Sequence, residues 1–411
     1  MPNNRRWLAV SAIGLSLFLS ALDGTIVTLA LPPIAQHFQL SASLVSAVTL
    51  GYAIPLTLLV LPAGDLVGRF RVLPIFLVAV LGFGLGSLLC GIASSFLLLL
   101  VGRIIQGCCA ALLATQGIAV AAAVVSPNER GRAMGLVGTL APLGGVAGPG
   151  VGGLLLAHFG WSSVFFVNVP MCGLAALLGI FSLGGMRLFD QRSDSAYRQM
   201  AALLRRPAFL WGLLAFLGSV SVAAALYYLL PFDLSDIQHL APTLAGGILL
   251  CVPLAMVVMG ILGGYLTDRY GAPPFILTGS GLLLIGLLLL TFVAGFRTSE
   301  LDLAWRLLLI GSGIGLFSGP NQTLLMSVGT RETMGAASAL SNLSTRLGSV
   351  CGPLVLGITW SFPASFSDQI RVGILVIDAL AVLNLLFAFL AVRRRAPAFS
   401  SEETPETTSM I

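Results

Sequence analysis

The chain has 411 residues but contains no lysine, and only 9% of its residues are charged. It also lacks a glycine-rich loop ending in Gly-Lys-Ser or Gly-Lys-Thr, which argues against ATP-driven work by this chain. Its six cysteines lie in apolar runs and are not spaced like metal ligands, so we expect neither a metal nor another cofactor. No polar segment is long enough to form a soluble catalytic domain. These absences argue against an enzyme.

Apolar residues make up 57% of the chain, and the mean hydropathy is +0.99. A bilayer core of about 30 Å is crossed by roughly 20 apolar residues, and backbone groups in lipid must be hydrogen-bonded within their own segment. The sequence therefore predicts an all-α integral membrane protein with twelve transmembrane helices. The expected spans are approximately 7–31, 43–64, 72–92, 96–125, 131–157, 162–185, 208–231, 242–265, 274–295, 303–328, 334–360 and 370–392.

The two halves of the chain repeat one another at an offset of about 203 residues. Asp65 matches Asp268, Arg103 matches Arg306, Glu129 matches Glu332, and the run 144–149 matches 348–353. Such repeats predict two pseudo-symmetric six-helix bundles with a site between them, an arrangement typical of transporters. We expect bundles at 1–185 and 207–395, a cytoplasmic linker at 186–206 and a disordered tail at 396–411.

The arginines predict the orientation in the membrane. Sixteen of them lie on the side of both termini, two lie in the opposite loops and three fall within the expected helices. Positive residues accumulate in cytoplasmic loops, so both termini are expected in the cytoplasm. The net charge of +5 reflects this topology, and we expect no nucleic-acid partner.

Several short motifs add a resemblance to a known family. They are Gly64-Asp65-Leu66-Val67-Gly68-Arg69, its copy Gly264 to Gly271, Leu22 to Pro32, Arg103-Ile104-Ile105-Gln106-Gly107, Gly144 to Gly153 and Trp161 to Pro170. At these motifs the sequence resembles the major facilitator superfamily, and more closely its drug:proton antiporters. The resemblance implies the major facilitator fold and a prokaryotic cytoplasmic membrane, and we expect a monomer. It also implies proton-driven export of lipophilic or cationic small molecules by alternating access. Fourteen-helix members carry two extra helices between the halves, for which this linker is too short.

Asp23 and Arg103 are the main candidates for coupling transport to protons. Each lies roughly 11–12 Å below the outer surface, so the two residues share a depth. A charge there costs at least about 2.5–3.5 kcal/mol, so it usually faces a cavity or a partner. Burial and the neighbouring arginine act in opposite directions on the carboxyl, which would let Asp23 exchange a proton for substrate. The alternative is a static ion pair that holds two helices together.

Other polar and aromatic residues are candidates for the substrate cavity, namely Thr25, Gln106, Tyr227, Tyr228, Asn321 and Gln322. For the two tyrosines, anchoring at the membrane interface is an equally good interpretation. Arg346 and Asp378 are expected to form a second ion pair within the membrane, with a structural role favoured over coupling.

Glycine motifs indicate close packing and gating. Gly144, Gly148 and Gly152 lie four residues apart on one helix face beside Pro149, and Gly348, Gly352 and Pro353 repeat the pattern. The family fold implies that these helices form seams between the halves, although close packing alone is the alternative. The expected gating loops contain Gly64, Asp65, Gly68 and Arg69 in the first half and Asp268, Arg269 and Gly271 in the second. The two arginines are also explained as ordinary cytoplasmic charges.

Two other functions stay open at this stage. One is a metabolite or sugar exporter of the same fold with a narrow substrate range. The other, from a different class, is a channel or a membrane sensor, against which the two-half repeat and the paired gating loops argue.

Overall fold

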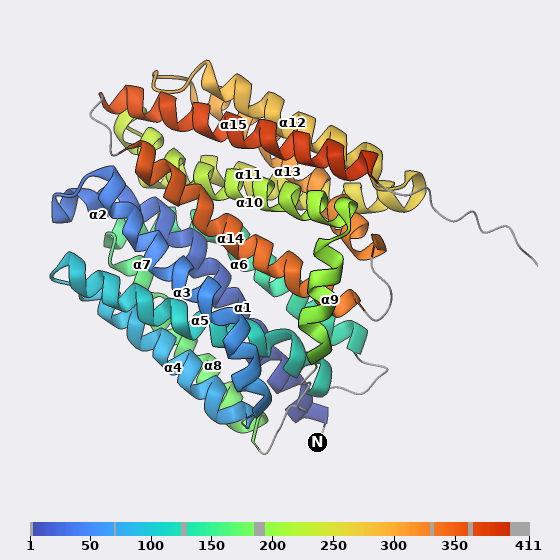
Figure 1. Cartoon of the computed structure of the whole chain (residues 1–411). Helices are drawn as coiled ribbons and strands as arrows, with labels where there is room; N and C mark the ends of the chain where they lie inside the picture. The colour runs from blue at the N-terminus through green and yellow to red at the C-terminus, as the bar shows by residue number, and fades with distance from the viewer. Residues whose placement is uncertain are drawn as a thin grey trace, which may run out of the picture.

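The computed structural model describes residues 3–69, 71–124, 130–184, 194–328, 333–360 and 365–394, and this part of the chain is almost entirely helical (Figure 1). The first half comprises α1 (Asn3–Ile26), a 3-10 turn η1 (Val27–Ala30), α2 (Leu31–Phe38), α3 (Ala42–Arg69), α4 (Val72–Gly91), α5 (Phe96–Val124), α6 (Arg130–Phe159), α7 (Ser163–Phe166) and α8 (Asn168–Ser182). After α9 (Asp194–Leu204), the second half comprises α10 (Pro207–Phe232), a π-helical turn η3 (Asp233–Ile237), α11 (Pro242–Tyr270), α12 (Pro273–Thr291), α13 (Glu300–Val328), α14 (Met334–Thr359) and α15 (Phe366–Arg393).

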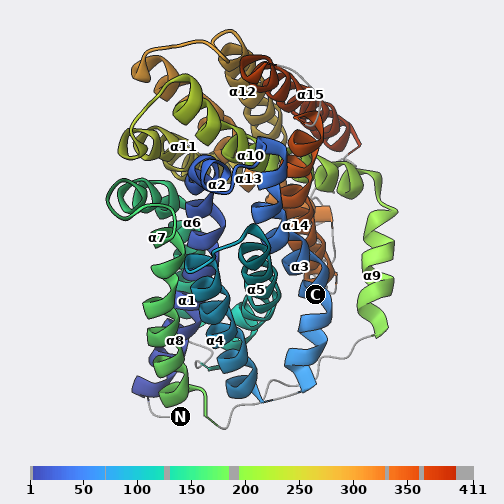
Figure 2. The same cartoon turned by 90° about the vertical axis from the view of Figure 1, so that its left-hand side faces the viewer.

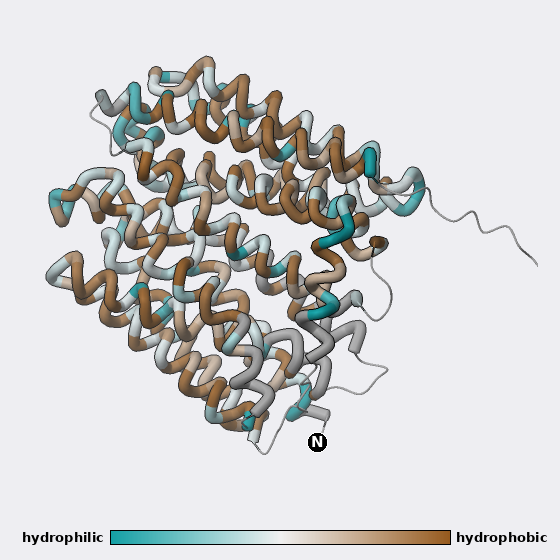
Figure 3. Tube along the Cα trace, in the orientation of Figure 1, coloured by the Kyte–Doolittle hydropathy of each residue, from teal (hydrophilic) through white to brown (hydrophobic). Residues whose placement is uncertain are grey.

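The long helices are built for a membrane. Ten segments of the described chain are long and apolar enough to cross one by length and composition, and a shorter apolar helix covers Leu143–Phe159. Hydrophilic residues gather mainly near the helix ends and on α9 (Figure 3). Of the twelve predicted spans, α14 falls short of this criterion, and α6 is described continuously with its side chains only over Leu143–Phe159. The serines, threonines and Asn342 of α14 lower its mean hydropathy.

The halves use the same internal packing, which confirms the predicted pseudo-symmetric bundles. In the first half, α1 packs on α6 and α8, while α3 and α4 pack on α5. In the second half, α10 packs on α14 and α15, while α11 and α12 pack on α13. Figure 2 shows the two groups of helices, with α9 running beside them.

Within the described chain, the most extensive contacts between the halves are those of α6 with α11 and of α3 with α14, as the resemblance implied. The first contact brings backbone against backbone. A Cβ built on Gly153 would lie 2.6 Å from the Pro242 carbonyl oxygen, and one built on Gly246 would lie 2.6 Å from that of Pro149. Any side chain at these glycines would separate the two helices.

Gly144, Gly148, Gly152, Gly348 and Gly352 pack inside their own halves, which corrects the seam expected for them, whereas Gly153 and the Pro149 backbone of the same motif lie at the seam with α11. A Cβ at Gly144 or Gly148 would overlap Phe18 or Thr25 of α1, and one at Gly152 would lie 3.1 Å from the Ile26 carbonyl oxygen. In the second half, Gly348 and Gly352 face α10 in the same way. The motif therefore lets α6 and α14 approach their own bundles, with Pro149 and Pro353 inside these two helices.

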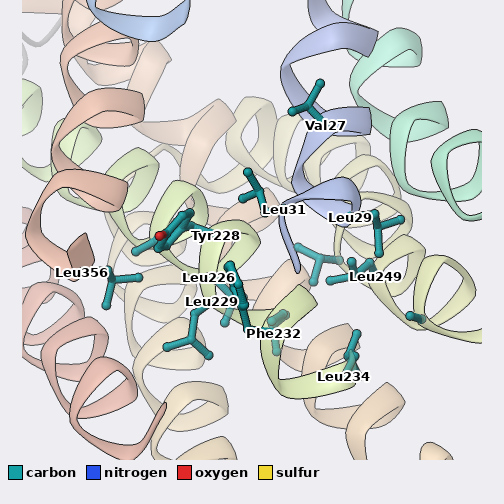
Figure 4. Packing of buried hydrophobic residues seen from close by; sticks show 14 of the residues in the cluster. Val27, Leu29, Leu31, Leu226, Tyr228, Leu229, Phe232, Leu234, Leu249 and Leu356 are labelled. Atoms are coloured by element: carbon teal, nitrogen blue, oxygen red, sulfur yellow. The ribbon is translucent and has the colours of Figure 1, made fainter. Parts of the chain in front are cut away.

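Among the side chains that the structure describes, buried apolar residues join the halves at one end. We call the end where α1 begins and α15 ends the terminal end, and the opposite end the far end. One buried cluster at the far end contains residues from both halves; Figure 4 shows Leu31 of α2 beside Leu226 of α10. The other three clusters among the described residues each stay within one half, one of them including Leu203 of α9.

The glycine packing gives a testable prediction. We expect Gly144→Ala to lower the thermal stability of the purified protein by about 1–3 kcal/mol, because the added methyl group overlaps the Phe18 carbonyl. The matched control is Gly145→Ala, whose methyl group would meet no atom within 4 Å. Equal melting temperatures for the two variants would contradict this account of the α1–α6 contact.

Candidate functional site

Asp23 and Arg103 form a buried ion pair in the first half. Arg103 Nη1 lies 2.6 Å from Asp23 Oδ2, and their side chains are 1% and 0% exposed. Asp23 lies in the last turn of α1, immediately before the backbone changes to the 3-10 turn η1. Arg103 comes from α5, so the pair connects the first and fourth spans.

Three side chains donate to the Asp23 carboxylate. Arg103 donates to Oδ2, while Gln106 Nε2 and Asn168 Nδ2 donate to Oδ1 at 3.2 and 2.7 Å. Gln106 Nε2 also donates to Ser87 Oγ on α4 at 2.7 Å. These bonds replace the water that the carboxylate would lose on burial, so the charge can be held away from solvent.

Arg103 is held as firmly as its partner. Its Nε donates to the Val48 carbonyl oxygen on α3 at 3.0 Å, and its Nη1 donates to Gln106 Oε1 at 2.8 Å. The guanidinium carbon lies 4.6 Å from the ring centroid of Tyr52, a distance suited to a cation–π contact. The arginine is thus fixed by groups from α1, α3 and α5.

Small residues let these helices come close enough for the network. A Cβ on Gly86 of α4 would lie 2.8 Å from the Gly102 carbonyl oxygen of α5. A Cβ on Gly107 of α5 would overlap the Tyr52 carbonyl oxygen of α3. With side chains at these positions, α4 and α3 would move away from the Arg103 and Gln106 side chains.

Sequence reasoning missed three members of this site: Tyr52, Ser87 and Asn168. Asn168 lay within the Trp161–Pro170 motif, where an amide between apolar residues was the available signal. It is fully buried, and its Oδ1 has no hydrogen-bond partner, so the Asp23 carboxylate is the contact that holds the side chain. Gln106, predicted only as a cavity residue, is a direct partner of both charges.

The other predicted cavity residues do not gather around Asp23. Thr25 donates to carbonyl oxygens of its own helix, and Asn321 Nδ2 donates to the Gly212 carbonyl oxygen in the second half. Gln322 lies next to Asn321, and its buried Oε1 has no hydrogen-bond partner. These positions stay predictions as substrate contacts.

Tyr228 contributes to the far end. Its hydroxyl donates to the Ala42 carbonyl oxygen across the two halves, and its ring packs on Phe232 and Trp360 with centroids 5.8 and 5.5 Å away. Tyr227 packs against the same buried cluster. This favours closure of the far end as the role of Tyr228.

The predicted Arg346–Asp378 ion pair is wrong. Asp378 on α15 accepts a hydrogen bond of 2.6 Å from Thr291 Oγ1 on α12. The Arg346 backbone carbonyl on α14 instead accepts a bond of 3.3 Å from Thr57 Oγ1 on α3. The cause is the packing of each helix, because α15 turns this carboxylate toward α12 while the Arg346 turn of α14 packs on α3.

The second half does not reproduce the buried pair. Arg306, the repeat partner of Arg103, pairs with Asp302 one turn away on the same helix, where both side chains are partly exposed. Its Nε donates to the Leu289 carbonyl oxygen. The buried ion pair is therefore found in the first half alone, among the residues that the structure describes.

The predicted gating residues are described only in part. Helix α3 continues through Gly64, Asp65, Gly68 and Arg69, whose side chains lie outside the described part of the chain. In the second half, Asp268 and Arg269 are exposed at the end of α11, and Arg269 lies over the Tyr270 ring. Gly271 ends α11 with φ of 81°, which favours glycine. Gating by these residues stays a prediction.

The buried network predicts strong coupling between its two charges. We expect Arg103→Met to destabilise the protein by about 3–5 kcal/mol, because it leaves the Asp23 carboxylate buried without its cation. Adding Asp23→Asn should recover part of that loss, and thermal melts of the purified variants measure this coupling. The partly exposed Asp302–Arg306 pair is the control and should show much weaker coupling. Additive effects at Asp23 and Arg103 would contradict a direct interaction.

Comparison with known proteins identifies the family to which this chain is related. The model of the Major Facilitator Superfamily matches residues 13–353. The multidrug resistance protein Stp of Mycobacterium tuberculosis strain H37Rv is 30% identical over 416 residues, covering 86% of this chain and 76% of that protein. The riboflavin transporter RibZ of Clostridioides difficile is 26% identical over 399 residues, covering 84% of this chain and 87% of that protein. The tetracenomycin C resistance and export protein of Streptomyces glaucescens is 28% identical over 414 residues, covering 86% of this chain and 76% of that protein.

A solved structure has the same fold. A bacterial homologue of the human lysosomal transporter Spinster, in an inward-facing and unoccupied conformation, aligns with a TM-score of 0.81 at 17% identity. The alignment covers 97% of this chain and 100% of the other. The chain therefore belongs to the Major Facilitator Superfamily and is a multi-pass membrane transporter.

Proposed function

We propose that this transporter exports lipophilic compounds in exchange for protons, with Asp23 as the coupling group. The observation that carries the proposal is the fully buried carboxylate beside the 3-10 turn that follows α1. A proton arriving at Asp23 would cancel one charge of the Asp23–Arg103 pair, and the freed arginine would need a new partner. Such a change gives the protein two arrangements with different interactions, as coupling requires.

The packing of the halves supports alternating access. The far end is closed by a shared apolar cluster and by the Tyr228–Ala42 hydrogen bond, whereas the terminal-end clusters belong to separate halves. If the arginine-rich terminal end is cytoplasmic, as the arginine distribution favours, this arrangement corresponds to an inward-open state. Export would then require the far-end seam to open and the terminal end to close.

The relatives support export without fixing the substrate. Stp is named a multidrug resistance protein, and the Streptomyces glaucescens relative is named a resistance and export protein. We extend export to this chain on those names and on the antiporter-like motif of α6. We also propose a bacterial cytoplasmic membrane as its location, with protons and small molecules as its partners.

A narrow metabolite transporter is the second candidate. The observation that favours it is the relative named a riboflavin transporter, which matches a similar share of this chain. The two functions differ in breadth. A drug exporter should respond to many unrelated lipophilic compounds, whereas a metabolite carrier should respond to one structural class.

Proton flux in inverted membrane vesicles tests the coupling. After energisation, lipophilic compounds should dissipate the internal acidity of vesicles that contain the wild-type protein. Asp23→Asn should abolish this response, because an amide side chain cannot bind and release a proton as a carboxylate does. Asp302→Asn is the matched control, since Asp302 is partly exposed and pairs only within α13.

Each outcome is informative. Full substrate-driven flux in Asp23→Asn would reduce the ion pair to a static contact between α1 and α5. A response of the wild type to a single compound class would favour the metabolite carrier. A wild type that gives no flux with any compound would refute proton-coupled export of lipophilic compounds.

A further inference from the structure

Arg346 is a charge in the middle of the membrane that has no ion-pair partner among the residues the structure describes. It lies roughly 18–20 Å from either end of α14 along the helix axis, out of reach of lipid headgroups. Within the described chain its guanidinium makes no hydrogen bond and no ion pair. The one acidic residue predicted to neutralise it, Asp378, instead bonds to Thr291.

The α14 helix presents Arg346 on a polar face. Ser338, Asn342, Thr345, Arg346 and Ser349 recur at intervals of three and four residues, so they share one side of the helix. Leu347, Leu354 and Ile358 lie toward the other side and are 40%, 42% and 58% exposed, as lipid-facing residues are. Gly348 and Gly352 occupy the side against α10. The polar face thus lies between the contacts of α14 with α10 and with α3.

This face lies toward the first half. The bond from Thr57 Oγ1 to the Arg346 carbonyl sets the register with α3, and the Tyr52 phenol on α3 lies within electrostatic reach of both Arg346 and Asp23. Asp23 itself is already occupied by Arg103, Gln106 and Asn168. Asn342 on the same face is exposed, and toward the terminal end the buried clusters of the described side chains belong to one half each. The charge left available between the halves is therefore positive.

We propose that Arg346 binds the anionic oxygens of a substrate that carries a carboxylate on a lipophilic body. The inference rests on the proposed export function and names its substrate class, replacing the expected cationic cargo with an acidic one. A guanidinium presents two parallel N–H donors to a carboxylate, and a site away from bulk water strengthens that pairing. The carboxylate of the bound substrate would then be the ion-pair partner of Arg346.

The test uses two dyes that differ in one carboxylate. Rhodamine B has a free benzoate, and its ethyl ester does not. Binding to the full-length protein in lipid nanodiscs is measured by fluorescence anisotropy, with empty nanodiscs subtracted. We expect the wild type to bind rhodamine B about tenfold more tightly than the ester. Arg346→Gln should remove that difference while still binding the ester, which also shows that the variant is folded.

Two further variants sharpen the result. Arg346→Lys keeps the charge but loses the paired donors, so it should retain only part of the preference. Arg306→Gln is the matched control and should keep the full preference, because Arg306 pairs with Asp302 near the far end. Equal affinity of the wild type for both dyes, an unchanged preference in Arg346→Gln, or no binding of either dye would each overturn the assignment.

Vesicle flux with the same dyes separates this inference from the proposed function. Proton flux driven equally by rhodamine B and its ester would keep proton-coupled export and overturn the role of Arg346. Carboxylate-dependent binding at Arg346 without proton flux would keep the anion site and overturn the coupling.

Discussion

The pairing of Asp23 with Arg103 is the interaction on which the first half depends. Two opposite charges stay within a low-dielectric bundle because the Asp23 carboxylate accepts hydrogen bonds from three side chains and the Arg103 guanidinium donates to three oxygens. These bonds use side chains of α1, α4, α5 and α8 and a backbone carbonyl of α3, so the pair fixes how these helices meet. The glycines at 86 and 107 follow from the same constraint, because the helices must approach closely for the network to close.

The same requirement explains the contrast between the halves. The second half keeps the helix contacts of the first but has lost the buried pair, since Arg306 lies near the far end and bonds to its own helix. Its conspicuous membrane charge is Arg346, on the helix that faces α3. Within the described chain, one half therefore holds a neutralised ion pair and the other a cation without an ion-pair partner, so proton exchange and substrate recognition can reside on opposite sides of the path.

The seam between the halves shows why motion is compatible with tight packing. Gly153 and Gly246 allow α6 and α11 to touch through backbone, a contact that tolerates a change of angle better than interlocked side chains do. Within each half, the glycines at 144 and 348 bind α6 and α14 to their own bundles. Each half can then move as a unit about the seam, while its internal contacts persist.

Composition and repeats in the sequence were enough to predict a helical membrane protein with two related halves, because the bilayer forces apolar runs into helices. Depth along the helices also indicated that Asp23 and Arg103 would meet. Only the tertiary structure decided which face each helix turns to its neighbours. That rotation brings Asn168 to Asp23 and separates Arg346 from Asp378. It also turns Gly144 and Gly348 toward α1 and α10 of their own halves. Helix rotation depends on side-chain packing between segments far apart in the chain, which residue spacing within one span does not encode.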